Sequence, residues 1–190
     1  MRHTLLALAA IATLSMGTAQ AESAIYAVDP SHTFVTFEIG HMGASTNRGR
    51  FDKKEGTVQL DRTGKTGKVD LKIDATSLST GTPAFDKHLQ SADFFNVAQF
   101  PNIAFSAEKF VFNGDKVAEV VGSLTLLGKT NPVTLKASQF NCYQSMQKRE
   151  VCGGDFDTTI QRSQWGMTWG ANYGFPDAVR LVVQVEAVKQ

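Results

Sequence analysis

The chain has 190 residues, of which 42% are hydrophobic, 9% aromatic and 19% charged. This is the composition of a globular protein of about one domain, and it excludes a disordered, collagen-like or low-complexity chain. The formal net charge of +1 excludes a strong overall field that would attract nucleic acid. Phenylalanine is frequent, with 13 copies against 3 tyrosines, and it supplies apolar volume without a polar group.

Residues 1–21 have the pattern of a cleaved secretory signal peptide. A short basic start precedes an apolar run at residues 5–14, and Ala19 and Ala21 are the small residues that a signal peptidase recognises. The run is too short to cross a membrane, which takes about 20 apolar residues. We therefore expect a neutral mature domain, residues 22–190, that is exported to the periplasm or secreted.

Alternation of apolar and polar residues predicts strands along most of the mature chain. It is clearest at residues 69–74, 133–138 and 179–188, and it is typical of antiparallel sheets with one covered face. Further strands are expected at residues 33–39, 48–60, 102–112, 116–127 and 154–164. Turns are expected at residues 63–64, 113–115, 128–132 and 152–154. Eight consecutive antiparallel strands favour an all-β closed barrel, with a β-sandwich as the alternative.

One connection between strands, near residues 83–96, breaks the two-residue period. Pro83 indicates the start of a short helix, on which Phe85 and Leu89 share a face. Phe94 and Phe95 follow, so the connection is unusually aromatic for a surface loop. It is either a lid packed on its own barrel or a lid over an interior that holds a ligand.

The parity of the strands places a set of apolar residues on the inner face of the barrel, with four more covering one end. The inner residues are Val35, Phe37, Ile39, Phe51, Val58, Val69, Leu71, Ile73, Phe105, Leu124, Leu126, Val133, Leu135, Ile160, Leu181 and Val183. The residues over the end are Phe85, Leu89, Phe94 and Phe95. Periodicity does not distinguish a barrel filled by these side chains from one that encloses a cavity.

Cys142 and Cys152 stand ten positions apart and are the two cysteines of the chain. In an exported protein this spacing predicts a local structural disulfide, whereas a redox-active pair would favour a C-x-x-C motif. Closing so short a loop would stabilise the fold by roughly 2.5–3 kcal/mol.

Five polar residues are candidates for contacts with the polar end of a ligand or for a gate: His32, His41, Asp86, His88 and Arg162. Arg162 shares a strand face with two apolar residues, so it needs either a carboxylate partner such as Asp29 or Asp86, or a ligand headgroup. The sequence contains no nucleophile elbow, zinc-protease, phosphate-loop or dinucleotide motif. The three mature histidines would form a zinc site only if the fold gathered them, and none is expected.

Several segments of the mature chain resemble the YceI-like family. They are Val28-Asp29-Pro30-Ser31-His32-Thr33, Gly40-His41, Gly49-Arg50-Phe51, Asp86-Lys87-His88-Leu89-Gln90-Ser91-Ala92-Asp93-Phe94-Phe95-Asn96, Phe100-Pro101 and Gln161-Arg162-Ser163-Gln164-Trp165-Gly166. The resemblance runs from about residue 26 to residue 188. The chain departs from the family at Phe85, where arginine is common, and in its cysteine pair.

This resemblance implies a lipocalin-like antiparallel barrel with an elongated apolar cavity, in periplasmic or secreted proteins that bind long-chain amphiphiles, often as dimers. We expect a binding protein that holds a polyprenyl compound, an isoprenoid quinone such as ubiquinone, or a fatty amide, for transport, storage or stress protection. It would need no cofactor, would not span a membrane, and could exchange lipid with one. The alternatives are a metabolic enzyme that uses Asp86 and His88, with or without a metal, and a scaffold with a filled barrel.

Overall fold

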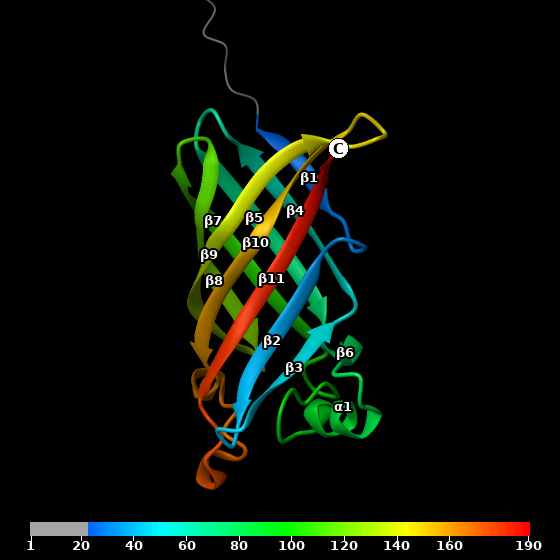
Figure 1. The fold of residues 1–190 in the computed structure, drawn as a ribbon, viewed down its shortest axis with the longest axis vertical. Helices are drawn as coiled ribbons and strands as arrows, with labels where there is room; N and C mark the ends of the chain where they lie inside the picture. The colour runs from blue at the N-terminus through cyan, green and yellow to red at the C-terminus, as the bar shows by residue number, and fades with distance from the viewer. Residues whose placement is uncertain (1–22) are drawn as a thin grey trace, which may run out of the picture.

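The computed structural model describes residues 23–190 and shows a closed antiparallel β-barrel of eight strand positions, with a short helix at its lower end (Figure 1). The all-β barrel predicted from the alternation is therefore confirmed. The predicted signal peptide, residues 1–21, lies outside the described residues.

The main elements follow one another along the barrel wall, as labelled in Figure 1. The strands are β1 (Ala24–Val28), β2 (Phe34–His41), β3 (Ser45–Phe51), β4 (Lys54–Asp61), β5 (Thr66–Asp74), β6 (Leu78–Ser79), β7 (Asn102–Asn113), β8 (Lys116–Leu126), β9 (Lys129–Gln144), β10 (Glu150–Gln161) and β11 (Ala178–Lys189). The helices are α1 (Pro83–Gln90) and the 3₁₀ helices η1 (Ala75–Ser77), η2 (Arg162–Trp165) and η3 (Ala171–Tyr173).

The sheet closes because β11 pairs with two strands on the same edge. Its residues 180–184 pair with β2, and its residues 187–189 pair with β1. The order of the sheet is β1-β4-β5-β7-β8-β9-β10-β11-β2-β3-β6, and the additional pairing of β1 with β11 closes the barrel. Closure leaves few unpaired strand edges on the barrel wall.

The single strand predicted at residues 48–60 is two strands, β3 and β4, because the chain bends between them. Asp52 N donates to Ser77 O at 3.1 Å, and Lys53 O accepts a hydrogen bond from Asp74 N at 3.0 Å. After the bend the chain leaves β2 and pairs with β1 and β5. Strand β1 itself was missed, because its outward residue Ile25 is apolar and breaks the alternation.

Two of the turns predicted from glycine and proline differ from the structure. The turn predicted at residues 128–132 is shorter and lies at Leu127 and Gly128, so strand β9 begins at Lys129 and includes Pro132. Strand β9 tolerates this proline because β10 pairs with it only from Lys136 onward. The segment 152–154 lies inside β10, where Gly154 packs so closely on the carbonyl of Gln139 that a side chain would collide with it. The hairpin turn lies instead at residues 145–149, closed by Ser145 N and Arg149 O at 2.9 Å.

Other predicted boundaries change at the barrel ends. The segment 162–164, predicted as the end of a strand, is part of η2. Helix α1 begins at Pro83 as predicted, although the Thr82 side chain makes no capping hydrogen bond. The predicted disulfide between Cys142 and Cys152 is present, and the two residues are directly opposite in the β9–β10 register. Within residues 23–190, no helix is long and apolar enough to cross a membrane.

Candidate functional site

The barrel encloses two apolar cavities, one above the other in the orientation of Figure 1. The upper cavity, about 80 Å³, lies where β1 and β4 complete the wall. The lower cavity, about 110 Å³, lies between β2, β3 and the lid formed by α1 and the residues that follow it. Each is larger than the roughly 10–15 Å³ that a water molecule needs, and an apolar wall disfavours water. The two spaces therefore suit an apolar occupant.

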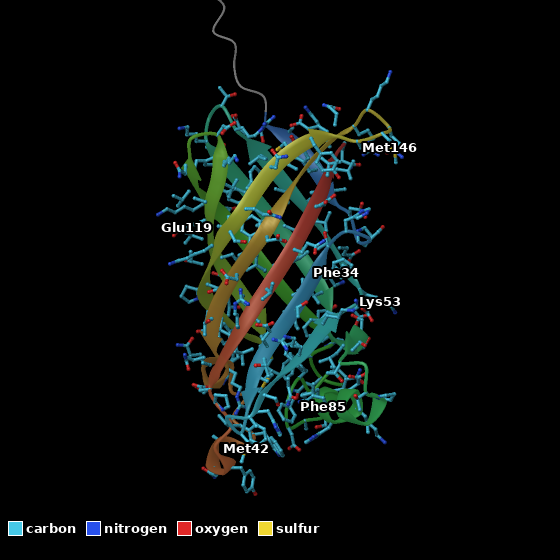
Figure 2. The ribbon with its side chains drawn as sticks, in the orientation of Figure 1. Phe34, Met42, Lys53, Phe85, Glu119 and Met146 are labelled. Carbon is cyan, nitrogen blue, oxygen red and sulfur yellow. A yellow bond between two sulfur atoms is a disulfide. The ribbon has the colours of Figure 1, made fainter. Side chains whose placement is uncertain are left out.

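Most of the residues predicted to face the interior line one of these cavities; the exceptions are Phe85 and Val133. The upper cavity contacts Val58, Val69, Leu71, Phe105, Leu135 and Val183. The lower cavity contacts Val35, Phe37, Ile39, Phe51, Ile73, Leu89, Phe94, Phe95, Leu124, Leu126, Ile160 and Leu181. Val133 is buried in the core, and Phe85 packs half-buried on α1 at the lower end (Figure 2).

The two cavities meet end to end near the middle of the barrel. On β5 the inward residue Leu71 lines the upper cavity and the next one, Ile73, lines the lower; Val183 and Leu181 do the same on β11. Two residues along a strand span about 7 Å. Phe105 pairs with Leu71 at this level, and its ring lies over Gly122, where an added Cβ would come 2.9 Å from Phe105 Cζ. Phe105 therefore lines the upper cavity next to the point where the two meet.

A cluster of rings closes the lower end of the barrel, and we call it the end cluster. Its members are His41, His88, Phe94, Trp169, Tyr173 and Phe175. Trp169 is central, with ring centroids 5.0 Å from both His88 and Phe94 and 5.8 Å from Phe175. The lid thus rests on the loop between η2 and β11 through aromatic contacts. Two predicted candidates, His41 and His88, belong to this closure.

Arg162 is the charged residue in the wall of the lower cavity and is only 3% exposed. Its Nε donates to Pro176 O at 3.0 Å and its Nη1 to Trp169 O at 2.8 Å. The predicted carboxylate partner, such as Asp29 or Asp86, is wrong, because Arg162 bonds backbone carbonyls instead. The loop that closes the barrel end supplies both of them.

The other polar candidates do not reach the cavities. The Asp86 carboxylate accepts hydrogen bonds from Thr80 N and Thr80 Oγ1, each 2.6 Å, and so secures α1 to the strand before it. His88 Nε2 lies 3.6 Å from an Asp93 carboxylate oxygen and not beside Asp86. His32 pairs with Asp29 on the outer surface, 2.8 Å away. The structure therefore brings His41, Asp86, His88 and Arg162 to the lower end, where Asp86 bonds Thr80 and is not part of the end cluster, and it leaves His32 apart from them.

Ion pairs of Glu150 with Arg62 and Lys189 lie at the upper end of the barrel. Glu150 pairs with Arg62 at 2.8 Å, and burial followed by the Glu150 charge raises the pKa of Tyr26, which lines the upper cavity. Cys152 lines the same cavity. Among the described residues, Cys142, Glu150 and Cys152 are the one group of possible metal ligands, and both sulfur atoms are in the disulfide.

Several residues that line the cavities were not predicted from the sequence. Tyr26 and Val28 were missed with β1, and Met167 follows η2 in a loop without a periodic pattern. Phe110 and Phe140 were not predicted to face the interior, although counting every second residue along β7 and β9 could have placed them there. A bulge interrupts this counting in β7, between residues 107 and 109. Another irregularity interrupts it in β9, where the register with β10 shifts between Asp155 and Phe156.

A closed antiparallel barrel with apolar cavities along its axis defines a class of β-barrel proteins whose interior has room for an apolar molecule. Comparison with known proteins gives the family. The YceI-like domain matches residues 26–187, and the chain belongs to this family. Protein YceI of Salmonella arizonae and that of Salmonella enteritidis are each 33% identical over 183 residues, which is 95% of either chain.

Solved structures share the fold. BcnA of Burkholderia cenocepacia aligns with a TM-score of 0.70 at 22% identity, covering 84% of this chain and 99% of BcnA. The YceI protein of Campylobacter jejuni aligns with a TM-score of 0.72 at 24% identity, covering 80% and 90%. A domain from Saccharophagus degradans, described as polyisoprenoid-binding, aligns with a TM-score of 0.65 at 15% identity, covering 89% and 100%.

Proposed function

We propose that the protein is an exported binding protein that holds one long apolar chain, of isoprenoid or related type, along the axis of its barrel. The observation that carries the proposal is the pair of apolar cavities that meet end to end. A polyprenyl compound, an isoprenoid quinone such as ubiquinone, or a fatty amide has the chain that such a space requires. Transport, storage or stress protection are the roles open to such a complex.

The energetics of burial support this proposal. Each methylene group moved from water into an apolar wall contributes about 0.8 kcal/mol. A chain of fifteen such groups would gain roughly 12 kcal/mol before the cost of ordering it is subtracted. This attraction needs no net charge, which agrees with a formal charge of only +1.

A binding role is also supported by the printed description of the Saccharophagus degradans domain as polyisoprenoid-binding. The alternative of an enzyme that uses Asp86 and His88 is disfavoured, because the Asp86 carboxylate bonds Thr80 and His88 lies beside Asp93. A scaffold with a filled barrel is disfavoured by the two cavities. These observations favour the binding function over both alternatives.

Native mass spectrometry of the full chain, expressed with its own N-terminal segment and purified from the exported fraction, tests the proposal. We expect a mass above that of residues 22–190, and an isoprenoid or long-chain compound in an organic extract. The same spectra show whether the protein is a homodimer, as the family resemblance led us to expect. An unliganded mass, with no uptake of added ubiquinone or fatty amide, would contradict the binding function.

A further inference from the structure

The lower end of the barrel terminates in two loops that contain no Asp, Glu, Lys or Arg, and we call them the lower tip. One is residues 39–47, around the turn between β2 and β3, and the other is residues 163–176, which lead from η2 toward β11. The four missing residue types make up 19% of the whole chain. Their absence from two consecutive surface loops sets this end apart from the rest of the molecule.

Side-chain contacts join the two loops into one surface. The ring centroids of His41 and Phe175 lie 5.4 Å apart. A Cβ added at Gly40 would lie 3.5 Å from Pro176 Cγ, so the backbones of the two loops are also close. Figure 2 shows Met42 at this end of the molecule.

The lower tip exposes apolar side chains at its surface. Tyr173 is 70% exposed and Met42 is 60% exposed, so most of each side chain lies in water. Trp169 is half-buried behind them, with its ring centroid 6.3 Å from that of Tyr173. Grouped exposed apolar side chains mark contact with a protein partner or a membrane. Tyrosine and tryptophan are enriched where a membrane meets water, because each combines an apolar ring with one polar group.

The charged residues at the four ends of these loops are all engaged within the protein. Glu38 and Arg48 pair with each other at 2.8 Å. Arg162 donates to two backbone carbonyls, and the Asp177 carboxylate accepts from Ser163 Oγ at 2.6 Å. The lower tip therefore offers apolar and neutral polar groups to a partner, and no cluster of cations that would require an anionic one.

The lower tip is continuous with the elements that close the lower cavity. The Trp169 ring lies 5.0 Å from the rings of His88 and Phe94 in the lid. Phe94 from the lid and Met167 from the tip both line the lower cavity. A partner that binds the tip therefore lies next to the end of the barrel that the lid closes.

We propose that the lower tip docks on a lipid bilayer, with Met42 and Tyr173 in the interfacial layer, and that an apolar chain passes there between the bilayer and the lower cavity. The docking goes beyond the proposed function, whereas the passage of the chain rests on it. Loops without charged side chains enter the interfacial layer without removing an ion from water, which would be costly. Burial of the apolar side chains supplies the attraction, so a bilayer of neutral, zwitterionic lipid is sufficient.

Binding to phosphatidylcholine vesicles tests the docking in the unmodified protein. We expect the protein to sediment with the vesicles. A nitroxide near the lipid headgroup should quench its tryptophan fluorescence, because Trp169 lies behind the exposed residues of the tip. Absence of binding, or binding only when the vesicles contain anionic phosphatidylglycerol, would overturn the proposal.

A charge introduced at the lower tip should weaken this binding. We expect Met42→Asp and Tyr173→Asp each to bind phosphatidylcholine vesicles about tenfold more weakly, because the interfacial layer disfavours a carboxylate. Both positions are exposed, and Met42 has a φ of 52°, a conformation that aspartate adopts more readily than most residues. Met146→Asp is the matched control, because Met146 is 96% exposed at the opposite end of the barrel (Figure 2). Native binding in both tip variants, or an equal loss in Met146→Asp, would overturn the proposal.

Two further measurements separate this proposal from its alternatives. A dimer in sedimentation velocity that Met42→Asp dissociates would assign the lower tip to a second copy of the chain and overturn docking on a bilayer. Transfer of a fluorescent polyene between phosphatidylcholine vesicles should be slower with the tip variants than with Met146→Asp, and equal rates would overturn passage at this end. Vesicle binding without any uptake of a long chain would contradict the proposed function alone, whereas uptake without vesicle binding would contradict the docking alone.

Discussion

Asp29 and His32 form an ion pair in the turn between β1 and β2 that depends on pH. The Asp29 carboxylate also accepts from Ser31 N at 2.8 Å, and its hydrogen bond with His32, ahead of the other contributions, lowers the pKa of Asp29 from 3.8 to about 2. The same bond raises the pKa of His32 above 6.5. Thr33, which is fully buried, follows this turn and bonds both backbone groups of Glu186 at 3.2 Å.

Replacement of Asp29 by asparagine should return the pKa of His32 toward 6.5, while the amide oxygen can still accept from Ser31 N. The Asp29 contribution to stability is present above pH 3.8 and is lost as the pH falls toward 2. The His32 contribution is present below pH 6.5 and is lost as the pH rises through its raised pKa. The stability difference between native protein and Asp29→Asn should therefore be largest between about pH 4 and pH 6.5.

Nuclear magnetic resonance titration of His32 and urea denaturation across this range check the prediction. An unchanged His32 titration in Asp29→Asn would contradict the pairing.

Single side chains show the limit of prediction from the sequence at the residue scale. The inward direction of Arg162 was predicted from its strand neighbours, but its partners were not, because Trp169 and Pro176 come from a loop without a periodic pattern.

At the scale of elements, β9 and β10 form a long hairpin that the disulfide joins near its turn. Cys142 and Cys152 are directly opposite, and Arg149 donates to Lys189 O at 2.8 Å beside them. The strands were predictable where apolar and polar residues alternate. The hairpin turn was not, since the glycines at 153 and 154 serve close contact with neighbouring strands and not a change of direction.

Reduction of this disulfide should lower the free energy of unfolding by about 2.5–3 kcal/mol, because the unfolded chain regains the freedom of the loop. Guanidinium denaturation with and without reductant measures the change. The strand pairings on either side should keep the circular dichroism of the native state unchanged. The double replacement Cys142→Ser with Cys152→Ser should show the same loss without reductant, and equal midpoints in all samples would contradict the prediction.

At the scale of the whole molecule, the proposed binding of one long chain requires that both cavities hold parts of the same ligand. Phe105 lines the upper cavity near the point where the two meet, and its ring lies over Gly122. The two halves of a long chain would contact different sets of residues. Blocking either cavity should therefore weaken binding of the same ligand.

Ile160→Phe should fill the lower cavity and Val120→Phe the upper one, each at a cost of about 1–3 kcal/mol in stability. We expect both variants to bind a long isoprenoid chain at least about tenfold more weakly. Thr159→Phe is the control, because Thr159 precedes Ile160 on β10 and faces the solvent. Fluorescence titration with a polyene ligand measures the affinities. Loss of binding in only one cavity variant would show that a single cavity holds the ligand.

The sequence by itself determined the barrel, its inward residues, the helix at Pro83 and the cysteine pair. Each depends on local chemistry: a two-residue period, a proline at a first helical position, or two thiols at short range. Tertiary structure decided that β1 and β2 share the edge of β11 and that backbone carbonyls hold Arg162. It also decided that the interior contains two cavities, which meet between the levels of Leu71 and Ile73 on β5. Alternation specifies which side chains face inward, but the volume left between them depends on how all eight positions of the wall pack together.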